Sequence, residues 1–161
     1  MKKRRQPAYT RHYTLLHEIS ASPIQPLPKE WQRTQLTSMW DGLRDMEQQP
    51  NPDTSAWRVC SDAVNLMETL VAQGEVEDGQ GLLMDAITAL AEAGKRHRAG
   101  HPLRLSGPGM RAVRAVLEDY AEVIAVLPAR TMIRCHRLTE KRLHEILAGR
   151  RLPHDVEVIA A

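Results

Sequence analysis

The sequence is poor in aromatic residues and in cysteine. Aromatic residues make up 4% of its 161 residues, and there is no Phe. A core built from Leu, Val, Ile, Ala, Met and a few Trp suits helix packing better than a sandwich of β-sheets. The two cysteines, Cys60 and Cys135, each lie within an apolar helical pattern. We therefore interpret them as reduced core thiols rather than as a disulfide framework.

Long hydrophobic runs are missing as well. The longest run covers residues 123–127, whereas a helix needs about 20 apolar residues to cross a bilayer. The basic start, formed by Lys2, Lys3, Arg4 and Arg5, is not followed by the apolar stretch of a secretory signal. The sequence thus predicts a cytoplasmic protein with no membrane span and no cleaved leader.

What remains is typical of one globular domain. Hydrophobic residues make up 42% of the chain and charged residues 26%, which excludes wholesale disorder. Residues 1–27 are basic, contain several prolines and show little apolar periodicity. We expect them to form a partly disordered arm and residues 28–161 to form the folded domain.

A period of 3.6 residues runs through most of that domain and predicts an all-α fold of about five helices. The expected helices run from Pro28 to Pro50, Asp53 to Ala72, Asp78 to Ala99, Ser106 to Leu127, and Pro128 to Gly149. One or two further turns are expected between Tyr13 and Ile19. Residues 103–105 and 156–159 alternate in hydropathy, so a short two-stranded ribbon between them is an optional addition.

The net charge of +2 conceals a strong segregation of charge along the chain. Residues 1–39 carry seven Lys and Arg against two Asp and Glu, a net charge of +5. Residues 40–92 carry two against eleven, or −9, and residues 93–161 carry thirteen against seven, or +6. These segments either neutralise each other inside the fold or present opposite faces to partners.

The last predicted helix has one apolar and one cationic stripe. Arg130, Arg134, Arg137 and Lys141 follow one another at helical spacing. A row of cations on a rigid helix is suited to phosphates or to an acidic protein face. The alternative is a solvated face, or one neutralised by the acidic segment. The candidate residues for binding a partner or nucleic acid are Arg130, Arg134, Arg137, Lys141, Arg142, Arg150, Arg151, Lys2, Lys3, Arg4 and Arg5.

Three other motifs are better explained by local structure than by DNA, phosphate or metal binding. Residues 143–153 are similar to the end of a helix-turn-helix repressor domain, but no separate preceding helix and tight turn are found. Residues 106–109 fit helix initiation better than a phosphate loop, since no Lys-Ser/Thr follows. His97 and His101 have metal-pair spacing but are interrupted by Gly100. No metal, cofactor or catalytic residue is predicted.

Two strings of residues carry a resemblance to a known group of proteins. Residues 56–66, AWRVCSDAVNL, and residues 137–143, RLTEKRL, resemble uncharacterised small proteins of phages, prophages and plasmids of proteobacteria. The similarity covers about residues 28–155 and transfers no binding residue. It implies a mobile-element setting, in which small non-enzymatic proteins act by occupying a host macromolecule.

These observations lead to two functional hypotheses. The first is a noncatalytic phage or mobile-element protein that binds a host protein or nucleoprotein complex through charged faces, for example as an anti-CRISPR protein. The second is a DNA-binding regulator that uses residues 130–151. The sequence does not identify the partner, DNA or RNA binding, or the oligomeric state.

Overall fold

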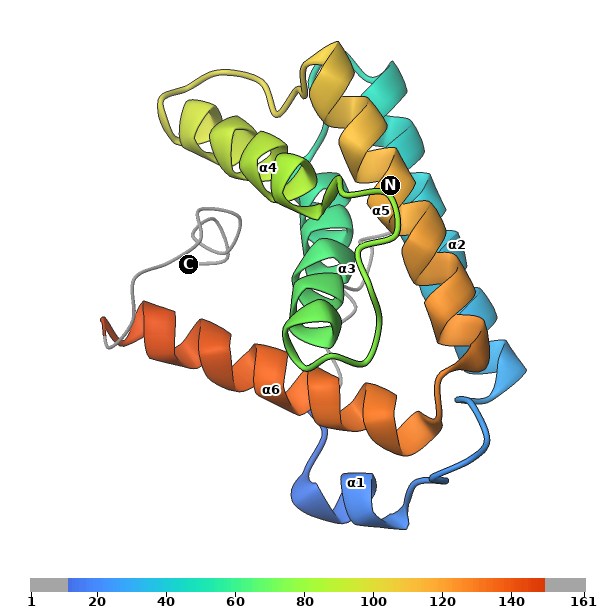
Figure 1. Ribbon diagram of the computed structural model, residues 1–161. Coiled ribbons are helices and arrows are strands. Elements are labelled where there is room, and N and C mark those ends of the chain that lie inside the picture. Colours follow the sequence, from blue (N-terminus) through green and yellow to red (C-terminus); the bar gives the residue numbers. More distant parts are fainter. Residues whose placement is uncertain (1–11, 150–161) are drawn as a thin grey trace.

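The computed structural model describes residues 12–149 and confirms the all-α prediction (Figure 1). Within this range the chain forms six helices and no strand. They are α1 (Leu15–Ser20), α2 (Lys29–Gln48), α3 (Thr54–Ala72), α4 (Leu83–Arg98), α5 (Gly107–Val126) and α6 (Ala129–Leu147). None of these six helices has the length and apolar character required to cross a membrane.

Two predicted details differ from the structure. The third predicted helix begins at Leu83 rather than at Asp78, because Gly81 adopts a left-handed turn with φ of +66°. Asp78 still serves the helix start, since its carboxylate accepts a hydrogen bond from the Leu83 amide at 3.2 Å. Residues 103–105 have no regular secondary structure. Their proposed partners, residues 156–159, lie outside the described residues.

The alternating hydropathy of residues 103–105 has a cause other than strand pairing. Leu103 is fully buried in the core, Arg104 is exposed, and Leu105 packs partly against the core. An extended segment that lies on a core needs this alternation even without a neighbouring strand. The alternation therefore arises because the two leucines are buried against the core, and not because the segment pairs with a strand.

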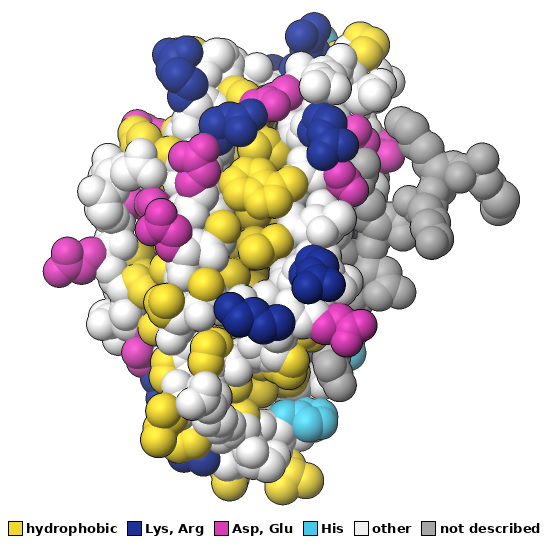
Figure 2. Space-filling view, turned by 90° about the vertical axis from the view of Figure 1, so that its right-hand side faces the viewer, with side chains coloured by type: hydrophobic (Ala, Val, Ile, Leu, Met, Phe, Trp, Pro, Cys, Tyr) yellow, Lys and Arg dark blue, Asp and Glu magenta, His cyan; other side chains and the backbone are white. Residues whose placement is uncertain are grey.

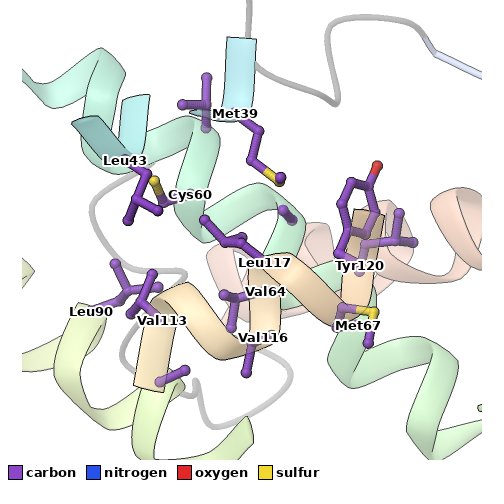
Figure 3. Packing of buried hydrophobic residues seen from close by; sticks show 14 of the residues in the cluster. Met39, Leu43, Cys60, Val64, Met67, Leu90, Val113, Val116, Leu117 and Tyr120 are labelled. Atoms are coloured by element: carbon purple, nitrogen blue, oxygen red, sulfur yellow. The ribbon is translucent and has the colours of Figure 1, made fainter. Parts of the chain in front are cut away.

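The core is organised around α3. This helix packs against α2, α4, α5 and α6 and lies in the middle of the molecule (Figure 1). Its buried side chains meet residues of α2, α4 and α5, including Met39, Leu90 and Leu117 (Figure 3). Cys60 and Cys135 are buried and form no disulfide, as predicted. Four methionines fill the core as expected, whereas Met84 is 57% exposed.

The described part of the predicted arm, residues 12–27, packs against α6. Pro128 precedes α6 and makes no side-chain capping hydrogen bond. The carbonyls of Ser22 and Gln25 accept hydrogen bonds from the amides of Arg130 at 3.0 Å and Ala129 at 2.8 Å. Backbone carbonyls from the N-terminal segment thus satisfy amides at the start of α6 that have no partner within the helix.

Gly42 allows α2 and α3 to approach closely. A Cβ atom at this position would lie 2.2 Å from Cγ2 of Val59 and 3.1 Å from the carbonyl oxygen of Ala56. Val59 is buried and has a stiff side chain, so the clash is not relieved by a simple rotation.

We expect Gly42→Ala to lower the free energy of unfolding by about 1–2 kcal/mol. Overpacking costs about 1–3 kcal/mol, and the better helix propensity of Ala returns up to about 1 kcal/mol. Urea denaturation measures the change. Gly79→Ala is the control, because a Cβ there meets nothing within 4 Å. Equal stabilities of the two variants would contradict the proposed close approach.

Candidate partner-binding surfaces

The cationic stripe of α6 is largely neutralised inside the protein. Arg134 forms an ion pair with Glu75, which follows α3, and Arg137 forms one with Glu18 of α1. Arg130 donates hydrogen bonds to the carbonyls of Ile19 at 2.9 Å and Ala21 at 3.2 Å. These three arginines hold α1 and the end of α3 against α6.

Arg142 is a buried residue with a structural environment. It is 8% exposed, forms an ion pair with Glu68 of α3, and donates to the carbonyl of Asn65 at 3.1 Å. Lys141 differs, because its side chain is 74% exposed and its ion pair with Glu145, one turn further along α6, spans 3.9 Å. Among the candidate residues of α6, Lys141 is therefore the one most available to a partner.

The remaining six candidate residues belong to the two terminal segments of the chain. Lys2, Lys3, Arg4, Arg5, Arg150 and Arg151 lie outside residues 12–149.

Two neighbouring hollows lie beside α6, the first between α6 and the segment with α1, the second between α6 and the end of α3. Their volumes are about 770 and 430 Å³, and both are lined by Gln73, Leu138, Lys141 and Glu145. The first extends to the Arg134 and Arg137 ion pairs described above. Because the charges around these hollows alternate in sign and several are paired, the hollows present no concentrated field to a charged ligand.

A layer of buried polar groups joins α3 to α6. The hydroxyls of Thr69 and Thr139 share a hydrogen bond of 2.6 Å, and Thr139 donates to the Cys135 carbonyl at 2.8 Å.

Burial lowers the pKa of His136 to about 4 and raises the pKa of the Cys135 thiol to about 11. Both groups are therefore uncharged near neutral pH, and a protonated thiol is a poor nucleophile.

The net positive charge of the C-terminal segment lies elsewhere, in residues 93–117, although Arg96 pairs with Glu92 and Arg114 pairs with Glu47. This stretch contains six Lys and Arg and no Asp or Glu, whereas residues 118–161 contain seven of each kind. The whole +6 of the C-terminal segment thus arises from residues 93–117. Sequence reasoning missed this because it summed charge over a longer segment that includes α6. Counting in a window of about 25 residues would have found it.

We call the exposed part of this stretch the cationic end. It comprises the last turn of α4, the connecting segment and the first turn of α5, at the top of the molecule in Figure 1. Its members are Lys95, Arg96, Arg98, Arg104 and Arg111, all exposed, together with His97 and His101.

No known protein family, curated protein or solved structure matches this chain. The surfaces therefore have to be interpreted from their own geometry.

Internal hydrogen bonds fix the shape of the cationic end. Arg96 donates to the carbonyl of Arg104 at 2.7 Å and so ties the connecting segment to α4. The His97 ring nitrogen Nδ1 lies 3.2 Å from the carbonyl oxygen of His101. That contact ties down the start of the connecting segment. Among residues 12–149, no cluster of three or more His, Cys, Asp and Glu is suited to hold a metal ion.

Helix α1 lies at the opposite end of the molecule (Figure 1), and hydrophobic side chains are exposed at that lower end in Figure 2. Helix α1 contacts α6, yet Leu15, Leu16 and Ile19 are 55%, 72% and 60% exposed. Ile24 and Val126 are also exposed, at 75% and 70%. Ion pairing through Glu18 explains the orientation, because it turns the polar side of α1 toward α6.

Proposed function

We propose that this protein is a noncatalytic interaction protein of a phage or mobile element that binds a host protein or nucleoprotein complex. The observation that carries the proposal is the cationic end, where Arg104 and Arg111 are exposed within a stretch, residues 93–117, that contains six Lys and Arg and no acidic residue. The net positive charge of this surface attracts an anionic partner.

The partners of the α6 arginines support this interpretation. Acidic residues of α1, α3 and the segment after α3 pair with Arg134, Arg137 and Arg142, so the charge of these three residues serves the fold. A DNA-binding regulator that uses residues 130–151 has less support for the same reason. In a mobile-element setting, occupation of a host defence complex, as by an anti-CRISPR protein, is one form that the proposed activity takes. That setting rests on the sequence resemblance.

A charge-dependent pull-down tests the proposal. The tagged full-length chain is incubated with proteobacterial lysate, and the bound proteins are identified by mass spectrometry. We expect a stoichiometric partner that is recovered by the wild type and lost by the variant Arg104→Glu/Arg111→Glu, because both positions lie in the cationic end.

The matched control is Lys29→Glu/Arg33→Glu, which changes the net charge equally at exposed positions of α2. We expect this control to recover the partner as the wild type does. Failure of the wild type to capture any stoichiometric partner, or equal loss in both variants, would contradict the proposal.

A further inference from the structure

We propose that a small cavity between α2, α3 and α5 binds one structural water molecule, which joins the hydroxyls of Ser38 and Tyr120. The inference is independent of the proposed function. The cavity offers about 10 Å³ to the centre of a water molecule, which is roughly what one water requires. Its walls are formed by Gln35, Ser38 and Met39 of α2, Val59 and Ala63 of α3, and Tyr120 of α5.

The hydroxyl of Tyr120 is a buried polar group with no hydrogen-bond partner among residues 12–149. The side chain is 1% exposed, and its hydroxyl points away from Met67 (Figure 3). A buried tyrosine hydroxyl normally bonds to a protein group or to ordered water, because an unpaired one is unfavourable. Burial raises the pKa of Tyr120 above its ordinary value. The hydroxyl therefore keeps its proton near neutral pH, and it can donate to a water as well as accept from one.

Ser38 supplies a second buried hydroxyl. Its Oγ atom also makes no hydrogen bond to the described residues. Within helices, Ser and Thr hydroxyls often donate to the carbonyl four residues earlier. Thr34 of the same helix does so, as do Thr69 and Thr139. Ser38 departs from this pattern, so its hydroxyl remains available to a partner in the cavity.

One water satisfies both hydroxyls at once. A buried water typically makes about three hydrogen bonds. Ser38 and Tyr120 provide two of them, and the side-chain amide of Gln35, which lines the same cavity, is suited to provide a third. A cavity with only apolar walls would exclude water. The two hydroxyls thus make this cavity a water site, and the bound water connects α2 to α5.

Direct bonds from Tyr120 to its other polar neighbours are the alternative to a water. Tyr13 and Asp62 lie close enough to raise the pKa of Tyr120, although burial has the larger effect. Neither of them forms a hydrogen bond with the Tyr120 hydroxyl. A water in the cavity therefore displaces no hydrogen bond of Tyr120.

A high-resolution crystal structure of the full-length protein tests the inference. We expect one water peak within about 2.5–3.0 Å of both Ser38 Oγ and Tyr120 Oη. In crystals of the double variant Ser38→Ala/Tyr120→Phe, which lacks both hydroxyls, the peak should disappear. A wild-type cavity without a water, or a direct hydrogen bond from Tyr120 to Ser38 or Asp62, would overturn the inference.

Urea denaturation of the single and double variants tests the bridge in solution. Each single variant leaves one buried hydroxyl unpaired, whereas the double variant leaves neither. The change in the equilibrium constant for unfolding in the double variant should therefore be at least about threefold smaller than the product of the two single changes.

The matched control combines Tyr120→Phe with Thr37→Ala, because Thr37 is exposed and adjacent to Ser38 on α2. The effects of these two substitutions should simply multiply. If the effects of Ser38→Ala and Tyr120→Phe also multiply, the two hydroxyls share no water. Neither experiment involves a partner, so failure of this inference is distinguishable from failure of the proposed function.

Discussion

Acidification from pH 6.5 to about 4 is expected to lower the free energy of unfolding by roughly 3 kcal/mol through His136 alone. The imidazole is 3% exposed on α6. Its ring packs 5.5 Å from the ring of Tyr13 and 6.2 Å from that of Trp31, measured between centroids. Burial opposes the charged imidazolium and lowers the pKa of His136 from 6.5 to about 4.

The direction of the effect follows from proton uptake. Between pH 6.5 and about 4, the unfolded chain binds a proton at His136 and the folded chain does not. Stability therefore rises with pH in this window. The contribution of the neutral imidazole is complete above pH 6.5 and is lost progressively as the pH falls.

Urea denaturation at several pH values measures this loss. Other groups also titrate in the window, so the informative quantity is the difference between the wild type and His136→Phe, which retains an aromatic ring. We expect the stability of the variant to depend less on pH, by roughly 3 kcal/mol over the window. His144→Gln is the control, because His144 is exposed on the same helix. Parallel curves for the wild type and His136→Phe would rule out the proposed role of burial.

Much of the fold could be predicted because its signals are local. Asp53 and Ser106 accept hydrogen bonds from the amides three residues later, at 2.9 and 3.1 Å, and the helices begin where these capping residues predict. The start of α4 was predicted too early, because the apolar period does not show that Gly81 interrupts the backbone with a positive φ. The capping residues of α3 and α5 can be recognised in the sequence, whereas the length of the loop before α4 cannot.

The partners of the α6 cations could not be predicted from the sequence. Arg134, Arg137 and Arg142 meet carboxylates that lie 59, 119 and 74 residues away in the chain. Periodicity shows which residues share a helix face, but not which other helix that face meets. A cationic stripe that stabilises a fold and one that binds a partner therefore look alike until the tertiary contacts are known.

The Arg142–Glu68 pair provides the sharpest test of this structural role. Its side chains are 10% and 15% exposed, and Arg142 also donates to the carbonyl of Asn65. Removing one member of a buried ion pair leaves the other charge without compensation and costs about 3–5 kcal/mol. We expect Arg142→Met and Glu68→Leu each to lower the free energy of unfolding by roughly 3 kcal/mol, toward the lower end of this range because neither side chain is fully buried.

The double variant Arg142→Met/Glu68→Leu distinguishes a specific pair from two independent contacts. Once both charges are removed, no buried charge is left uncompensated, so we expect less destabilisation than the sum of the single changes by at least about 1 kcal/mol. The control is Lys141→Met, which lies on the exposed side of the same helix and should change stability by no more than about 0.5 kcal/mol. Strict additivity in urea denaturation would show that the pair does not act as a unit. In that case Arg142 would join α6 to α3 through the Asn65 carbonyl and not through Glu68.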